Sequence, residues 1–319
     1  MVPFELTADP VAEIMPRARV FNNKAEWLDY KRTRLSGTDF SAIIGEDTYN
    51  TPLSIYARMR GLWKPEDISN IDAWLGLRME GICSEWYEEQ TGRTLEDLGE
   101  YTLIEHRAIP RFVGTLDRVC KSAEGRKGPG VVELKTSNPG FFYDWVDAPP
   151  LKYHFQLLSY LACTEFSWGS LVCLWRGGRH DPILADYIRR RDIEDKLILP
   201  VVDKFLTMVD KGIEPPATGL EIDKSVLLGI YGDSVEATKM ITLADEYGSD
   251  LKLIHNLRAN KKALGTALCK VENKVLQAMG DAGAATTRTG WGASANPHKR
   301  GNTTVRPLRI RKPKDDYNL

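Results

Sequence analysis

The pattern of apolar and polar residues predicts alternating helices and strands over the first part of the chain. Between residues 71 and 91, apolar side chains recur at spacings of three and four, the period of one helix face. They are Ile71, Leu75, Met79, Ile82 and Trp86. Gly92 follows and is expected to end the helix. Three segments rich in β-formers then predict strands: YTLIEHRAI (101–109), FVGTLDRVC (112–120) and GVVELKT (130–136).

Another helix and another strand complete this part of the chain. LKYHFQLLSYLACT (151–164) has a helical pattern, and SLVCLWR (170–176) is an apolar run typical of a buried strand. The resulting order, α-β-β-β-α-β, predicts an α/β fold in which helices flank a mixed sheet. Two prolines and two glycines in GIEPPATG (212–219) end the pattern. We therefore place the first domain at residues 1–217.

Residues 218–285 are predicted to form a helical accessory segment. Six apolar residues fit a heptad pattern, in which Lys261 interrupts one core position. They are Ile254, Leu257, Leu264, Leu268, Val271 and Val275. Such a helix can form a coiled coil between subunits or pack in a helical hairpin within one chain, and the sequence leaves both open.

The distribution of charge separates a third segment, residues 286–319. The 319-residue chain has a formal net charge of −1. This segment contains eight Lys or Arg residues and two Asp residues, a net charge of +6, which leaves −7 for the rest. A basic C-terminal tail on an acidic body is typical of proteins that bind nucleic acids. A solvated tail that maintains solubility is the alternative.

The remaining composition argues against several classes of protein. The chain has five cysteines without a C-x-x-C pair, so we expect no zinc site, iron–sulfur cluster or disulfide framework. We interpret them as buried small side chains: Cys83, Cys120, Cys163, Cys173 and Cys269. No apolar run is long enough to span a membrane, and the N-terminal MVPFELTADP has no signal-peptide pattern. We therefore expect a cytosolic protein.

The candidate chemistry lies on two of the predicted strands. Asp117 and Glu133 occur in mostly apolar segments, where a carboxylate is costly unless it is paired or bound to a cation. Two converging carboxylates offer the oxygen ligands that suit Mg²⁺. Lys135 lies two residues after Glu133, so both side chains are on the same face of the strand. This grouping is suited to phosphodiester hydrolysis, in which bound metal ions activate water and a lysine orients or deprotonates it.

Further residues extend this pair into an ordered series. Glu80 adds a carboxylate on the helix before the strands, and Gly76, one turn earlier, leaves room beside it. Gln156 follows on the next helix. For an isolated E-x-K, a surface ion pair is the simpler explanation. The complete order D…E-x-K…Q is instead that of the PD-(D/E)xK nucleases.

With these residues in order, the chain resembles the YqaJ-type viral recombinase family, which is the lambda exonuclease family. The resemblance covers most of residues 26 to about 165. Four blocks carry it: EWLDYKRTRLSGTDFSAIIG (26–45), AWLGLRMEGICSEWYEEQTG (73–92), FVGTLDRV with VVELKT, and YHFQLLSYL (153–161). It implies a PD-(D/E)xK restriction-endonuclease-like core with a helical C-terminal accessory segment.

The resemblance also implies roles for the residues of the series. The implied ligands of Mg²⁺, or of Mn²⁺, are three carboxylates and one backbone carbonyl: Glu80, Asp117, Glu133 and Leu134. Lys135 would serve the attacking water, and Gln156 would support the site from its helix.

A pocket for the phosphate of a 5′ DNA end is implied as well. Its members are basic and hydroxyl side chains: Lys31, Arg32, Arg34, Ser36, Thr38 and Thr115. Lys31 and Thr38 replace the Arg and Ser of the family, so the charge and the hydroxyl are kept while the bidentate geometry of Arg is lost. An N-terminal helix with a solvated basic face is the alternative.

The loop after E-x-K departs from the family. TSNPGFFYDWVDAPP (136–150) has Phe141 near the place where the lambda enzyme has an Arg. The aromatic residues of this loop are Phe141, Phe142, Tyr143 and Trp145. They can stack on an unpaired base at a duplex end or pack beneath the loop.

The implied activity is that of a 5′-to-3′ exonuclease on linear double-stranded DNA, which leaves 3′ overhangs for phage-type recombination in a bacterial host cell. A ring-shaped homo-oligomer and a single-strand annealing protein are the expected partners. The alternatives are an endonuclease of the restriction or repair type and a DNA-end-binding scaffold that has lost catalysis. The scaffold is disfavoured because no acidic ligand is missing and Lys135 is present.

Overall fold

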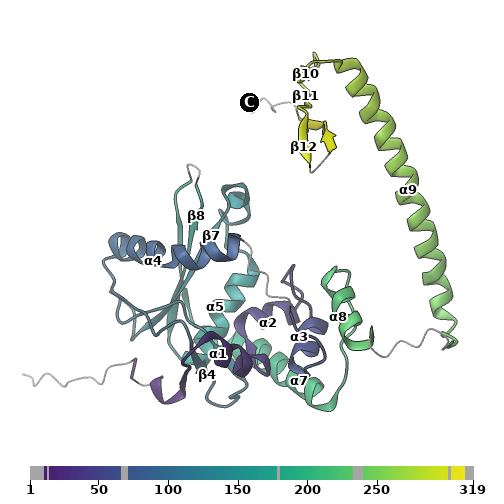
Figure 1. The fold of residues 1–319 in the computed structure, drawn as a ribbon. Helices are drawn as coiled ribbons and strands as arrows, with labels where there is room; N and C mark the ends of the chain where they lie inside the picture. The colour runs from purple at the N-terminus through teal and green to yellow at the C-terminus, as the bar shows by residue number, and fades with distance from the viewer. Residues whose placement is uncertain are drawn as a thin grey trace, which may run out of the picture. The chain divides into compact units, whose positions relative to one another are not determined.

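The computed structural model describes residues 11–12, 14–65, 71–177, 180–232, 240–300 and 303–312. The chain divides into two units, Met1–Glu236 and Ala237–Leu319. Figure 1 shows that the first consists of sheets and helices and that the second has one long helix followed by short strands. The domain boundaries predicted at residues 217 and 285 stay predictions.

A five-stranded mixed sheet organises the first unit. In spatial order its strands are β3 (Leu95–Glu96), β6 (Arg118–Cys120), β7 (Gly130–Ser137), β8 (Trp168–Trp175) and β9 (Ile183–Ile188). β7 and β8 run parallel, and the other neighbours are antiparallel. All eight residues of β8 are buried, as expected for an apolar strand that is covered on both faces.

Two helices cover opposite faces of this sheet. They are α4 (Ile71–Thr91) and α5 (Leu151–Thr164). Tyr87 of α4 belongs to one core cluster with Val132, whereas Leu157 of α5 belongs to another with Val131. Successive residues of β7 thus alternate between the two cores, because neighbouring side chains of a strand face opposite sides. The predicted α/β class, a mixed sheet with flanking helices, is confirmed.

A second, four-stranded sheet contains part of a segment that the sequence assigned to one strand. In spatial order its strands are β1 (Ala18–Val20), β4 (Thr102–Glu105), β5 (Phe112–Gly114) and β2 (Leu35–Ser36). The single strand predicted over 112–120 is wrong, because the chain bends after Gly114 and enters β6 of the other sheet. Asp117, at the end of the bend, accepts a hydrogen bond from the backbone N–H of Leu134 at 2.8 Å. This bond fixes the bend beside β7, and the apolar pattern of the sequence continues through it unchanged.

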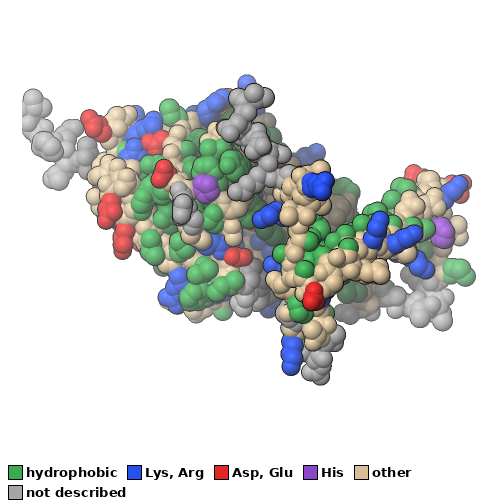
Figure 2. Space-filling model, turned by 90° about the horizontal axis from the view of Figure 1, so that it is seen from above, with side chains coloured by type: hydrophobic (Ala, Val, Ile, Leu, Met, Phe, Trp, Pro, Cys, Tyr) green, Lys and Arg blue, Asp and Glu red, His purple; other side chains and the backbone are tan. Residues whose placement is uncertain are grey.

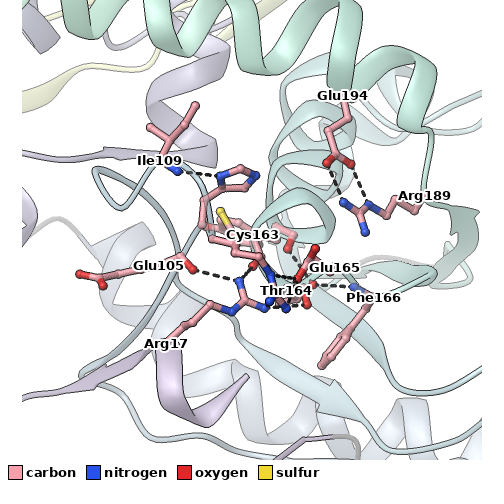
Figure 3. A network of polar contacts seen from close by, with 12 residues as sticks. Arg17, Glu105, Ile109, Cys163, Thr164, Glu165, Phe166, Arg189 and Glu194 are labelled. Carbon is pink, nitrogen blue, oxygen red and sulfur yellow. Dashed lines mark hydrogen bonds and ion pairs between the residues drawn. The ribbon is translucent and has the colours of Figure 1, made fainter. Parts of the chain in front are cut away.

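Both predicted helices of the site region are confirmed, and their ends have clear causes. Gly92 follows α4 with a φ of 66°. Arg17, in the short helix η1 (Met15–Arg17), donates hydrogen bonds to the carbonyl oxygens of Cys163 and Thr164 at 2.5 and 3.3 Å (Figure 3). Its guanidinium therefore supplies donors and positive charge at the C-terminus of α5, where carbonyl groups lack helical partners.

Further helices and turns complete the described part of the first unit. They are α1 (Lys24–Arg32), α2 (Gly37–Ile43), α3 (Pro52–Met59), η2 (Pro139–Asp144), α6 (Arg191–Ile193) with η3 (Glu194–Ile198), α7 (Leu199–Lys211) and α8 (Ile222–Tyr231). Val226 of α8 is fully buried in the main core. Asp223 of α8 accepts a hydrogen bond from the hydroxyl of Thr51 at 2.5 Å, so α8 is fixed to the start of α3.

The second unit is a long helix followed by two small sheets. Helix α9 runs over Glu246–Met279. The strands of the larger sheet are β10 (Ala284–Thr286), β11 (Gly292–Ser294) and β14 (Arg309–Arg311), and those of the smaller sheet are β12 (His298–Arg300) and β13 (Thr303–Val305). Arg306 donates to the carbonyl oxygens of Gly280 and Ala282 at 2.6 and 2.7 Å, so it holds the turn after α9. The segment predicted as a tail therefore contains strands, while Lys314 lies outside the described residues.

Residues 240–300 contain one continuous helix, α9. The coiled coil between subunits and the helical hairpin within one chain both stay predictions, because α8 and α9 belong to different units. One expectation for the second unit is corrected, namely that all five cysteines are buried. Cys269 is exposed on α9, although the other four cysteines are buried as predicted. No helix among the described residues has the length and apolar content needed to cross a membrane.

Candidate functional site

A cleft of about 1030 Å³ opens beside α4 and β7. Its walls include the residues of the predicted series Glu80, Asp117, Leu134 and Lys135. Gly76 also lines it, and a Cβ atom there would meet only Thr136, at 3.9 Å. The missing side chain thus leaves space beside Glu80, as the sequence predicted.

Strand pairing brings Asp117 and Glu133 together. In the antiparallel register of β6 and β7, Arg118 pairs with Val132. Asp117, just before β6, therefore lies beside Glu133, just after Val132. Glu133 is fully buried, and Lys135, two residues on, donates a hydrogen bond to its Oε1. The shared face expected for Glu133 and Lys135 is therefore present.

Helix α5 adds a second donor to the same carboxylate. Gln156 Nε2 donates to Glu133 Oε1 at 2.5 Å and to the hydroxyl of Tyr160 at 3.1 Å. Gln156 is buried, so it is not the polar residue at a helix surface that an isolated Gln would suggest. The remaining oxygen, Glu133 Oε2, is buried without a hydrogen-bond partner.

Burial, and then repulsion by a neighbouring carboxylate, raise the pKa values of Glu133 and Glu80. Burial raises the pKa of Glu133 to about 8, and the charge of Asp117 adds to this shift while Lys135 opposes it. Burial also raises the pKa of Glu80 to about 7, and the charge of Asp117 adds to this shift. Arg118, whose Nη1 lies 3.8 Å from Glu80 Oε2, opposes it. Burial lowers the pKa of Lys135, but attraction to Glu133 and Asp117 outweighs burial and raises it overall.

These residues fit a hard divalent cation. The side-chain donors among the expected ligands are carboxylate oxygens, and one of them, Glu133 Oε2, is buried without a partner, which is costly unless a cation or water satisfies it. A positive charge in the cleft would also relieve the repulsion that raises both pKa values. Within the described residues, however, no three side chains of the Asp, Glu, His and Cys types are already gathered around one point as metal ligands.

The N-terminal helix α1 places Lys31 within electrostatic range of Glu133. The pKa of Lys31 is lowered by burial, against the attraction of Asp39 and Glu133. The ammonium of Lys31 lies 4.6 Å from the ring centroid of Trp27. Lys31 is partly exposed, whereas Arg32 at the end of the same helix is exposed.

The hydroxyl residues of the predicted phosphate pocket divide into two groups. Ser36 and Thr38 lie together at the start of α2, with 2.8 Å between their oxygens. Ser36 is buried and Thr38 is exposed. The hydroxyl of Thr115 is buried without a hydrogen-bond partner, in the bend between β5 and β6.

Arg32 and Arg34 are engaged elsewhere. Arg32 forms an exposed ion pair with Asp29 at 3.2 Å on the same helix. The guanidinium carbon of Arg34 lies 3.2 Å from the ring centroid of Tyr30. Neither arginine contacts Ser36 or Thr38 through a hydrogen bond in the described structure.

Sequence reasoning missed an ion pair beside the serine and threonine. Arg58 of α3 lies 3.1 Å from Asp39, and Asp39 accepts hydrogen bonds from both the backbone N–H and the hydroxyl of Ser36. Arg58 occurs in PLSIYARM (52–59), a mostly apolar segment for which no element was predicted from the sequence. Its role depends on the approach of α3 to α2, which no local motif reports.

The four aromatic residues of the loop 136–150 divide into two that are packed and two that are exposed. Phe142 packs edge-on against Trp175 with ring centroids 5.4 Å apart, and Trp145 is only 3% exposed. Phe141 and Tyr143 are exposed instead, and Phe141 lines the cleft. Phe142 and Trp145 therefore pack beneath the loop, while the rings of Phe141 and Tyr143 stay exposed.

Comparison with known protein families matches residues 26–167 to the YqaJ-like viral recombinase domain. This stretch is similar to that domain. The matched stretch includes α4, β7 and α5, and with them every residue of the D…E-x-K…Q series. The predicted resemblance is confirmed.

The chain is also similar to individual proteins. The uncharacterized protein YqaJ of Bacillus subtilis (strain 168) is 23% identical over 182 residues, which cover 54% of this chain and 55% of that protein. The chain thus spans about half the length of this curated relative.

Solved structures with a partial likeness include two exonucleases. The alkaline exonuclease LHK-Exo from Laribacter hongkongensis has 18% sequence identity and a TM-score of 0.49, over 60% of this chain and 95% of that chain. A phage-related exonuclease from Haemophilus somnus 129PT has 14% identity and a TM-score of 0.42, over 56% and 95% of the two chains.

Proposed function

We propose that this protein is a metal-dependent 5′-to-3′ exonuclease that acts on linear double-stranded DNA and produces 3′ overhangs for recombination. One observation carries the proposal: Asp117 and Lys135 line one cleft, Lys135 donates a hydrogen bond to the buried Glu133 carboxylate, and the other oxygen of Glu133 has no partner. Structural ion pairs rarely leave a buried carboxylate oxygen unsatisfied, whereas a metal site requires such an oxygen before the ion binds.

The proposed ligands of a Mg²⁺ or Mn²⁺ ion are Glu80, Asp117, Glu133 and the backbone carbonyl of Leu134. When bound, the ion would lower the pKa of water and neutralise charge on the scissile phosphate. Lys135 would orient the attacking water by donating a hydrogen bond to it, or would accept the water's proton after first releasing a proton of its own to solvent; in either role it must leave Glu133. Gln156 would hold the Glu133 carboxylate in one orientation.

A pocket for the 5′ phosphate is proposed at the start of α2. Lys31, Ser36 and Thr38 would bind the phosphate by charge and by hydroxyl donation. Arg58, held by Asp39, would add positive charge beside them. Thr115 is a further hydroxyl candidate, whereas Arg32 and Arg34 would have to leave Asp29 and Tyr30 to take part.

The proposed partners follow from this activity. DNA ends are the substrate, a ring-shaped homo-oligomer would keep the enzyme on one strand, and a single-strand annealing protein would receive the 3′ overhang. Light scattering of the purified full chain tests the oligomer, and co-purification with the annealing protein tests the last of these partners.

The central test compares three duplexes with one sequence: linear with 5′ phosphate, linear with 5′ hydroxyl, and nicked circular. Each is incubated with Mg²⁺ and with a chelator, and strands labelled at the 3′ end report direction. We expect Mg²⁺-dependent release of mononucleotides from the 5′ end, fastest with a 5′ phosphate. Cleavage of the circular DNA away from its nick would support the endonuclease instead, and binding of ends without hydrolysis in Mg²⁺ or Mn²⁺ would support the scaffold.

A further inference from the structure

Helix α9 carries an apolar stripe that is exposed in the described structure. Leu257, Leu264, Leu268 and Val271 are 55%, 72%, 56% and 60% exposed. Figure 2 shows apolar side chains along this helix with Lys and Arg beside them. A helix in water depends mainly on packing its apolar face, so a stripe of more than three heptads needs an occupant.

The heptad positions favour an antiparallel partner over a parallel one. The a positions are Ile254, Lys261, Leu268 and Val275, and the d positions are Leu257, Leu264, Val271 and Ala278. In a parallel pair, a faces a, so Lys261 would lie beside Lys261 of the second copy. In an antiparallel pair, a faces d, and Lys261 would face Val271 instead. The other layers would then be apolar, including Leu264 against Leu268 and Leu257 against Val275.

Charges beside the stripe complement one another in this same register. Arg258 and Glu272 are both e positions, and e faces e in an antiparallel pair, so each Arg258 would lie beside Glu272 of the second copy. Two-fold symmetry gives this ion pair twice and places Gly265 beside its own copy at the centre. Neither Arg258 nor Glu272 forms an ion pair within the described part of the chain.

We propose that α9 is a self-association surface on which a second copy of this chain packs antiparallel, centred near Gly265, with Arg258 of each copy paired to Glu272 of the other. The apolar layers supply the stability, and the two ion pairs select the direction and register. This inference does not depend on nuclease activity, so its failure would leave the proposed hydrolysis of DNA untouched and would bear only on the proposed homo-oligomer.

Charge reversal in the full chain tests the pairing, with association measured by light scattering and sedimentation. Arg258→Glu and Glu272→Arg alone should each weaken self-association by about tenfold, because both symmetric pairs become repulsive. The double variant should restore it, and a mixture of the two single variants should form heterodimers. Lys252→Glu makes the same charge change outside the stripe and should have no effect. A monomer at all concentrations, or association that is indifferent to these reversals, would overturn the proposal.

Cross-linking tests the direction separately, in a Cys269→Ser background that removes the exposed thiol. Gly265→Cys should form a disulfide between copies, since the two residues adjoin only in the antiparallel pair. Lys261→Cys should cross-link poorly, because it would face Val271. Cross-linking through residue 261 and not through 265 would show a parallel pair and overturn the proposal. Circular dichroism confirms that each variant keeps its helix.

Discussion

Gln156 on α5 holds the Glu133 carboxylate of β7 by one oxygen, with 2.5 Å between Nε2 and Oε1. Lys135 donates to that same oxygen, so the other one stays buried without a partner. A carboxylate fixed on one side presents its free oxygen in one direction, which is how outer residues orient a metal ligand. Gln156 is therefore expected to act through Glu133 and not by touching DNA.

Gln156→Leu should lower the rate of DNA hydrolysis by about 10- to 100-fold and raise the Mg²⁺ concentration needed for half-maximal rate, since loss of an orienting partner typically has this cost. The measurement is a Mg²⁺ titration of hydrolysis, with circular dichroism to confirm folding. Gln90→Leu, an exposed change on α4, is the control. An unchanged Mg²⁺ requirement would show that Gln156 only fills space.

Asp117→Ala and Lys135→Ala should each abolish hydrolysis while the protein stays folded and binds DNA. Removal of a ligand or of the group that orients water costs several kcal/mol of barrier, and each 1.4 kcal/mol is about tenfold in rate. Single-turnover digestion and DNA binding are measured on the same samples. Lys204→Ala on α7 is a matched control, because Lys204 is exposed and does not line the cleft. More than about a tenth of the wild-type rate in Lys135→Ala would contradict its role.

The sequence predicted the parts of the site that depend on local spacing. Glu133 and Lys135 share a strand face because two residues separate them, and the helix pattern placed Glu80 correctly on α4. The apolar residues of the segments 151–164 and 130–136 predicted the helix α5 and the strand β7. Each of these features needs only the period of one element.

The rest depends on contacts between distant segments, which a single sequence does not report. The apolar pattern of 112–120 continues through the bend before Asp117, so one strand was predicted where two sheets divide the segment. Arg58 meets Asp39 only because α3 packs beside α2. Tertiary packing determines both the bend before Asp117 and the contact between Arg58 and Asp39.

Thr38→Ala should slow digestion of 5′-phosphorylated ends far more than that of 5′-hydroxyl ends. The exposed hydroxyl, 2.8 Å from that of Ser36, is one of the groups proposed to bind the terminal phosphate, which a 5′-hydroxyl end lacks. Rates on the two substrates are compared as a ratio, with Lys24→Ala at the exposed start of α1 as the control. Equal slowing of both substrates would mean that Thr38 supports the fold alone.

Stability should depend on pH through His106. This side chain is 6% exposed, its Nδ1 accepts the backbone N–H of Ile109 at 3.1 Å, and burial lowers its pKa. The folded state therefore binds this proton less readily than the unfolded state, whose His has a pKa of about 6.5. The neutral ring therefore makes its full contribution to the free energy of unfolding above a pH of about 6.5. That contribution is lost as the pH falls through the lower pKa of the folded state.

The measurement for His106 is urea unfolding at pH 7.5 and 5.5. His106→Gln cannot titrate but keeps an acceptor, so the wild type should lose more stability than this variant on acidification. The comparison cancels carboxylates that titrate in both proteins. An equal loss in the two proteins would show that His106 is protonated without cost.

The basic strands after α9 should bind DNA mainly through its phosphates. Arg288, Lys299 and Arg309 are exposed there, while Arg306 is excluded because it holds the turn after the helix. Changing the three to Gln should weaken DNA binding and reduce the slope of log affinity against log salt by about two to three units, since each phosphate contact contributes about 0.9. Lys252, Lys262 and Lys270, changed to Gln on the outer side of α9, remove the same charge elsewhere. A slope that stays unchanged in the folded, active strand variant, or one that falls equally in the helix control, would show that these strands are a solvated surface and not a DNA contact.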